Sequence, residues 1–251
     1  MKPITSGMRP PTIILFGASG VGKTSCAATA SRPLFADSNQ GTMSIADVKG
    51  LEHLRQEDVK GVDDLDTVYD NMTGRGKKNW SKLFDTVVFD HFDDIQMIIM
   101  EQLGDKRKER DSRKDADEAE QKDYGIMGNR MRRYLRKFKS VPKAKILICG
   151  EMEDRETGRM RPSLIGALKN QAPFLVDHSF YLRIGKKGVR YLHMNPTEDF
   201  YAKTRARWLP PELRKLRYDL DDLTFLTRLF ALFAAGPKGL PAFTATLNKR
   251  K

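Results

Sequence analysis

Short apolar runs recur along the chain and are separated by longer, more polar segments. Four of these runs are rich in β-branched and aromatic residues, which is typical of buried strands. They are TIILF (12–16), PLFAD (33–37), FDTVVFD (84–90) and AKILICGE (144–151). Helical patterns lie between them, and strands that alternate with helices form a mainly parallel, twisted sheet with helices on both faces. The pattern therefore predicts an α/β fold.

Two further apolar runs predict an antiparallel hairpin at one edge of this sheet. They cover 177–184 and 189–195 and are joined by GKKG, which is typical of a turn. A helix of small residues is expected at 24–32, directly after the first strand, because Pro33 closes it.

Two amphipathic helices are predicted in the second half of the chain. Each has apolar residues at helical spacing, so that one stripe of its surface can be buried. The helix at 126–140 carries Met127, Met131, Tyr134, Leu135 and Phe138 on its stripe and a basic opposite face. The helix at about 221–234 carries Leu223, Leu226, Leu229, Phe230 and Phe233.

These elements divide the chain into three parts. Residues 1–11 are expected to form a flexible arm, 12–210 the α/β core, and 211–251 a helical tail that ends in the basic NKRK. Within the core, 104–124 is a charged insertion with a basic first half, an acidic second half and no apolar periodicity. We expect a solvated helix or a mobile loop there.

The loop after the first strand carries the strongest chemical signal, GASGVGKT (17–24). Its glycines permit positive φ angles and close backbone approach, so that successive N–H groups can point at phosphate oxygens. In this pattern Lys23 reaches the β- and γ-phosphates and Thr24 binds Mg²⁺ through its hydroxyl. The helix that follows directs the positive end of its dipole at the same place. The predicted nucleotide-binding residues are Gly17, Ala18, Ser19, Gly20, Val21, Gly22, Lys23, Thr24 and Ser25.

Carboxylates at the ends of other strands complete the predicted site. Asp90 ends the strand TVVFD and is the expected second ligand for Mg²⁺, which proteins hold through one or two carboxylates plus phosphates. Asp93 and Asp94 are expected to cap the helix that follows. Asp37, Asn39 and Glu151 follow or end neighbouring strands, and each is a candidate for orienting the attacking water.

Charge and composition narrow the class of protein. The formal net charge of +12 favours polyanions such as nucleic acid, although it could equally serve solubility. Cys26 and Cys149 lie in apolar segments and are expected to be reduced and buried. No apolar run is long enough to span a membrane, and the first eleven residues lack the apolar region of a secretory signal, so a cytoplasmic protein is expected.

The order of these motifs resembles that of phage RecA-like nucleotide-binding proteins, the compact relatives of RecA and RadA, and in particular the Sak-type single-strand annealing recombinases. The resemblance covers about 12–210 and rests on the glycine loop, FDTVVFD, the charged insertion, KILICGE and FYAKTRARWLP (200–210). It implies a RecA-like P-loop NTPase core with Mg²⁺-dependent ATPase activity. In these relatives a glutamate after the second strand activates the water, and Asn39 occupies its position here. Hydrolysis is therefore expected to be slow, or Asp37 or Glu151 substitutes.

The resemblance also assigns roles to basic residues. Lys203 and Arg205 match a pair that reaches from one protomer to the nucleotide of the next, where a cation stabilises charge on the transferred phosphoryl group. Single-stranded DNA is expected to contact two irregular segments, with Tyr124 as a stacking aromatic. The candidate DNA contacts are Lys106, Arg107, Lys108, Arg110, Arg155, Arg159 and Arg161.

The expected function is ATP-driven annealing or pairing of single-stranded DNA by a ring or filament of protomers. A single-strand DNA-binding protein is a further possible partner. Two alternatives stay open. One is a P-loop kinase or other phosphotransferase with the charged insertion as a lid, and the other is an ATPase subunit of a helicase-loading or DNA-packaging machine.

Overall fold

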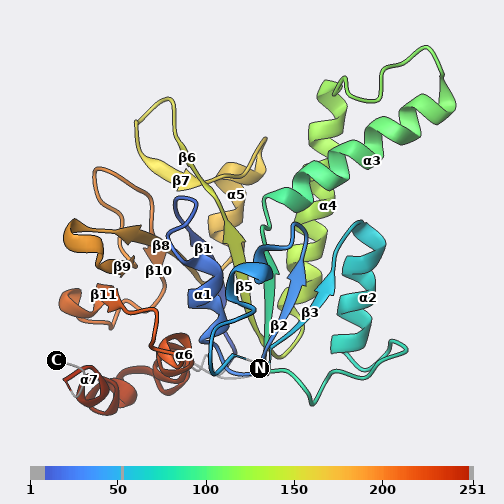
Figure 1. Cartoon of the computed structure of the whole chain (residues 1–251). Helices are drawn as coiled ribbons and strands as arrows, with labels where there is room; N and C mark the ends of the chain where they lie inside the picture. Colours follow the sequence, from blue (N-terminus) through green and yellow to red (C-terminus); the bar gives the residue numbers. More distant parts are fainter. Residues whose placement is uncertain (1–8, 52–53, 249–251) are drawn as a thin grey trace, which may run out of the picture.

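In the computed structural model, which describes residues 9–51 and 54–248, one nine-stranded sheet organises the chain (Figure 1). The strand order is β11-β9-β8-β1-β5-β4-β2-β3, and β10 pairs with β8 outside this row. The parallel strands are β1 (Thr12–Phe16), β2 (Pro33–Asp37), β3 (Arg55–Asp58), β4 (Thr86–Asp90), β5 (Ala144–Cys149) and β8 (His178–Ile184). The antiparallel strands are β9 (Arg190–His193), β10 (Lys203–Thr204) and β11 (Lys215–Tyr218). The predicted α/β fold and its antiparallel hairpin are confirmed.

Strand β1 lies near the middle of the sheet, which explains its unbroken apolar sequence. Successive side chains of a strand point to opposite faces. Ile14 and Phe16 accordingly pack into one core, and Ile13 and Leu15 pack into the other. Helices close both cores, so both faces of the sheet are covered as predicted.

The helices divide between the two faces. The first core is covered by α2 (Val62–Met72), α3 (Asp94–Arg110), α4 (Gln121–Lys139) and α5 (Leu168–Leu175), and the second by α1 (Lys23–Ala28), α6 (Phe225–Ala235) and α7 (Leu240–Asn248). The 3₁₀ turns are η1 (Gly41–Ile45), η2 (Lys186–Gly188), η3 (Pro211–Arg214) and η4 (Gly236–Gly239).

No helix in the described ranges is both long enough and apolar enough to cross a membrane.

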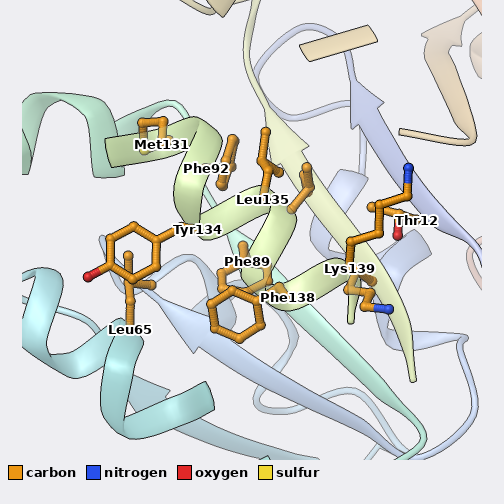
Figure 2. A pocket seen from close by; sticks show the side chains of 11 residues that line it. Thr12, Leu65, Phe89, Phe92, Met131, Tyr134, Leu135, Phe138 and Lys139 are labelled. Atoms are coloured by element: carbon orange, nitrogen blue, oxygen red, sulfur yellow. The ribbon is translucent and has the colours of Figure 1, made fainter. Parts of the chain in front are cut away.

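Helix α4 forms the centre of the first core (Figure 2). Its Tyr134 and Phe138 lie beside Leu65 of α2 and Phe89 of β4. The rings of Phe89 and Phe138 meet edge to face, with 4.7 Å between their centroids and an angle of 79° between their planes. All five apolar residues predicted for the stripe of this helix are buried, so that prediction is confirmed.

The charged insertion is helical at its two ends and non-helical between them. Its basic half continues α3 as far as Arg110, and its acidic half passes through a non-helical segment before α4 begins at Gln121. Figure 1 shows the two helices side by side, extending beyond the sheet. The guanidinium of Arg107 binds the Asp123 carboxylate and the Glu118 carbonyl oxygen, which ties the two halves together.

Several boundaries differ from the predictions. The helix expected at 24–32 ends at Ala28, because the Thr29 hydroxyl donates to the Cys26 carbonyl oxygen at 2.7 Å and the chain then turns toward β2. Strand β5 ends at Cys149, so Glu151 is not its last residue. Glu151 instead begins a separate hairpin of β6 (Glu151–Glu153) and β7 (Met160–Pro162).

The C-terminal segment is part of the core. The tail expected to be only helical also contributes strand β11, and α6 packs against the end of α1. There the Leu226 N–H donates to the Thr29 hydroxyl at 2.9 Å.

Cys26 and Cys149 are free and buried, as predicted. The first eight residues of the expected arm and the last three of NKRK lie outside the described residues.

A buried histidine gives this fold an expected acid sensitivity. His178 of β8 stacks on Phe233 of α6 with 4.3 Å between ring centroids, and its Nδ1 lies 2.9 Å from the Thr204 hydroxyl. Burial lowers the pKa of His178 from 6.5 to about 4. Between these values the unfolded chain binds a proton that the folded chain excludes, so the free energy of unfolding falls as the pH falls from 6.5 toward 4, by about 3 kcal/mol in total.

Urea unfolding at pH 7 and at pH 4.5 measures this loss. We expect His178→Phe, which keeps a ring against Phe233 but cannot titrate, to lose less stability over this interval than the unmodified protein. Equal losses in the two proteins would show that His178 does not cause the acid sensitivity.

Candidate nucleotide site

The loop between β1 and α1 has the backbone that the glycine pattern predicts. Gly22 has a φ of 92°, in the left-handed region that favours glycine. At Gly17 the limit is space, because a Cβ atom would lie 2.2 Å from the carbonyl oxygen of Leu182 in β8. The loop therefore presents main chain, with little side-chain bulk, at the carboxyl end of β1, where open α/β sheets bind ligands.

Lys23 begins α1 and folds back across the loop. Its ammonium donates to the carbonyl oxygens of Gly17 at 2.9 Å and Ala18 at 2.8 Å. Only 8 % of Lys23 is exposed, and this burial lowers its pKa. The carboxylates of Asp93, Glu151 and Asp90 act in the opposite direction, and the first of these has the largest effect. Lys23 therefore lies over the loop, where its ammonium interacts electrostatically with three carboxylates.

Thr24 and Asp90 lie together, as a shared magnesium ion requires. The Thr24 hydroxyl donates to Oδ1 of Asp90 at 3.4 Å. Asp90 is fully buried, and burial raises its pKa to about 6. Its Oδ2 accepts no hydrogen bond from any residue that the structure describes. A buried carboxylate with a free oxygen beside a hydroxyl is a suitable partial ligand set for Mg²⁺.

The protein supplies only part of the coordination of such an ion. The described residues contain no cluster of three or more His, Cys, Asp or Glu side chains able to hold a metal by themselves. The residues present therefore fit an ion that takes its remaining ligands from phosphates and water, which is the usual arrangement for Mg²⁺.

Asp37 is engaged in holding its own loop. Its carboxylate accepts the N–H groups of Asn39, Gly41 and Thr42 at 3.1 to 3.2 Å, and also the Thr42 hydroxyl at 2.7 Å. These bonds fix the start of η1 next to Asp90 and leave Asp37 poorly placed to accept a proton from water. Asn39 is exposed, and its Oδ1 and the Asp90 carboxylate both face Gly41, but an amide cannot accept a proton from water. The geometry favours neither of them as the base.

Glu151 is the better placed of the three candidates. Its carboxylate is near enough to Lys23 to raise the pKa of that ammonium. The pKa of the Tyr181 phenol is raised by the burial of that phenol and by its interaction with the Glu151 carboxylate. Oε2 of Glu151 is buried and has no hydrogen-bond partner among the described residues. An unpaired carboxylate oxygen beside the phosphate-binding lysine is what a water-orienting group needs.

Asp93 stands at the N-cap position of α3, but its side chain does not cap the helix, so the prediction for this residue is wrong. No side-chain bond closes the N-terminus of this helix. The Asp93 carboxylate instead accepts the N–H of Gly150 at 2.8 Å, at the point where the chain leaves β5 for Glu151. Asp93 therefore helps to place Glu151, a role that depends on a contact between segments 57 positions apart and has no signature in the local sequence.

The loop opens into a pocket of about 330 Å³. Five residues that the sequence analysis missed line it: Gly41, Ser44, His91, Arg190 and Leu220. His91 has a φ of 60°, which is uncommon for a residue other than glycine, and its Nδ1 lies 3.6 Å from Oδ1 of Asp90. Its position directly after the predicted metal ligand was the available signal. Arg190 and Leu220 reach the loop only through the folding of the antiparallel strands.

Lys203 and Arg205 lie far from the nucleotide loop of their own chain. Strand β10 pairs with the first residues of β8, next to the start of β1, whereas the loop follows the end of β1. The Lys203 ammonium binds the Pro173 carbonyl oxygen. Arg205 binds the Asp177 carboxylate at 3.3 Å and the Phe174 carbonyl oxygen at 3.0 Å. The pair could therefore act on a nucleotide only in another protomer.

The candidate DNA contacts fall into two groups. Lys106, Lys108 and Arg110 are exposed on α3, and Arg155 is exposed in the turn between β6 and β7. Arg159 is partly covered and lies over the ring of Tyr201.

Two of the candidates are corrected. Arg107 binds Asp123 within the α3–α4 pair, and the buried Arg161 lies 3.3 Å from the Asp154 carboxylate. Their side chains are turned inward and are not available on the surface.

Fold and loop together define a P-loop NTPase. A family model described as an AAA domain matches residues 9–206, and the chain belongs to this family, whose members are P-loop ATPases. A search of the curated proteins found no match. The matched segment begins just before β1 and ends just after β10, so it contains the loop, Asp90, Glu151 and Arg190 but not Leu220.

Proposed function

We propose that the protein is a Mg²⁺-dependent, RecA-like ATPase that binds single-stranded DNA and promotes its annealing or pairing. The observation that supports this most is the connection between two strands and the basic segments that follow them. Strand β4 ends in Asp90 and continues into the basic end of α3. Strand β5 leads to Glu151 and the basic β6–β7 hairpin. Each proposed DNA segment is thus the direct continuation of a residue at the nucleotide.

In the proposed reaction different residues bind the phosphates, hold the metal ion and activate the water. Lys23 leaves the loop carbonyls and binds the β- and γ-phosphate oxygens, and the loop N–H groups hold the remaining phosphates. Mg²⁺ bound through Thr24 and Asp90 supplies positive charge to the phosphate oxygens. Glu151 orients the attacking water and accepts its proton.

Head-to-tail assembly is part of this proposal. Lys203 and Arg205 lie at the edge of the sheet opposite the nucleotide loop, so repeated contact of one edge with the other places both cations at a neighbour's nucleotide. Such a contact is heterologous and generates rings or filaments. Phe174 is 76 % exposed beside this pair and would become buried in the contact.

The direct test measures ATP turnover alone, with single-stranded DNA and with duplex DNA. We expect single-stranded DNA to increase turnover several-fold and duplex DNA to have little effect. The reason is that only unpaired bases can stack on an aromatic side chain such as Tyr124. Binding of a fluorescent oligonucleotide should weaken steeply with added salt, since lysines and arginines displace counterions.

Variants separate the parts of this proposal. Arg205→Ala should cut DNA-stimulated turnover by roughly a hundredfold or more while nucleotide affinity of the dilute protein stays unchanged, because the arginine acts on a neighbour. Lys77→Ala removes an exposed charge in the segment between α2 and β4 and serves as the control. Stimulation by duplex alone would instead indicate a motor on double-stranded DNA, and turnover unaffected by any DNA would contradict the proposal.

A further inference from the structure

The pocket at the glycine loop has two chemically different ends. At one end lie Gly41, Ser44 and His91, next to the Asp90 carboxylate. At the other lie Arg190 and Leu220, which approach Gly22 from the antiparallel side of the sheet. A triphosphate that shares a cation with Thr24 and Asp90 directs its γ-phosphate toward the first end. Its nucleoside must then extend toward the second.

Leu220 provides an apolar surface at that second end. It lies in the turn between β11 and α6, and 43 % of it is exposed although its Cδ2 is only 3.2 Å from where a Cβ of Gly22 would be. An exposed leucine against a phosphate-binding loop does not serve the phosphates. A flat ring that packs on this side chain buries apolar surface, which favours binding.

Arg190 provides a cation that has no counterion among the described residues. Its Nε donates to the Val21 carbonyl oxygen at 3.0 Å, which fixes the side chain against the loop. Within the described part of the chain no carboxylate lies at ion-pair distance from its guanidinium. A guanidinium has five N–H donors, so this bond leaves others for an anionic or hydroxylated ligand.

We propose that Leu220 and Arg190 form the nucleoside end of the site, with Leu220 packed on the face of the base and Arg190 bound to the α-phosphate and the ribose. This inference rests on the proposed nucleotide-binding function. It brings the segment beyond residue 206, outside the match to the family model, into the binding site. Because a leucine contacts the face of a base and not its edge, its contribution is the same for different purines.

Calorimetric titration of Leu220→Ala with ATP, GTP and inorganic tripolyphosphate, each with Mg²⁺, tests the inference. We expect the Kd for ATP and for GTP to rise together by about fivefold to tenfold, as the loss of one partly covered apolar side chain implies. The Kd for tripolyphosphate should not change, because that ligand has no base. Leu83→Ala, an exposed leucine at the start of the segment leading into β4, is the matched control and should change none of the three.

The outcomes distinguish this inference from the proposed function. If Leu220→Ala weakens tripolyphosphate as much as ATP, or leaves ATP binding unchanged, the nucleoside does not lie on Leu220 and the inference is wrong. If the unmodified protein binds neither ATP nor tripolyphosphate, the nucleotide site itself is wrong and both proposals are overturned. Lys23→Ala in the same titrations should weaken all three ligands, which marks the phosphate end independently of Leu220.

Discussion

Lys23→Ala is expected to weaken ATP binding by roughly a hundredfold or more, since it removes two or more charge-assisted hydrogen bonds to phosphate. The ammonium already lies over the loop, where it donates to the carbonyl oxygens of Gly17 and Ala18, and it exchanges these bonds for bonds to the phosphates. Removal of the charge also leaves the carboxylates of Asp93, Glu151 and Asp90 without the Lys23 charge that partly offsets their repulsion of the phosphates. Calorimetric titration with ATP and Mg²⁺ measures the loss.

A matched control separates charge at the site from charge in general. Lys77→Ala removes one exposed lysine in the segment between α2 and β4 and should leave the affinity unchanged. Thermal unfolding without nucleotide should be nearly the same for both variants. If Lys23→Ala retained full affinity, the glycine loop would not be the phosphate site, and the proposed function would have to be abandoned.

Glu151→Gln should lower turnover by roughly a hundredfold to ten-thousandfold while ATP binding is retained. Glutamine has nearly the shape of glutamate and can still position water, but it cannot accept the proton. Two observations support this role: the buried Oε2 of Glu151 has no hydrogen-bond partner among the described residues, and its carboxylate lies within electrostatic reach of Lys23. Phosphate release under saturating ATP, with and without single-stranded DNA, gives the rate, and a parallel titration gives the affinity.

Asn39 and Asp37 provide the comparison. Asn39→Glu restores the residue that the resemblance implies at this position, and a large gain in turnover would show that Glu151 is not the main base. Asp37→Asn should act differently, through the loss of hydrogen bonds to residues 39–42, and should lower thermal stability as well as the rate. Turnover that is unaffected in Glu151→Gln would contradict the assignment directly.

The central part of the fold could be predicted because burial dictates its sequence. Strands β1 and β2 agree with the predicted ranges residue for residue, since a strand covered on both faces must be apolar throughout. Edge strand β3 has the sequence RQED and is mostly exposed, so it has no hydrophobic pattern to detect. Helix α2 did carry a signal, because its buried residues Leu65, Val68, Tyr69 and Met72 follow helical spacing, and it was overlooked.

The predicted site divides in a similar way. The residues of one continuous motif, such as Lys23 and Thr24, were predictable because their spacing along the chain is also their geometry. Asp93, Arg190 and Leu220 act through contacts between distant segments, and their local sequence would fit any surface. Only the sheet order, which places β8 beside β1 and then β9 and β11 beyond β8, brings the last two to the loop.

The bond between α6 and the end of α1 has a consequence for the boundaries of this protein. The family match ends at residue 206, but ten buried residues of the second core come from later in the chain: Leu209, Leu216, Tyr218, Phe225, Leu226, Leu229, Phe230, Leu232, Phe233 and Phe243. A fragment trimmed to the matched region would expose the apolar sides of β1, β5 and α1 to solvent. The shared family segment is therefore smaller than the unit that can fold alone.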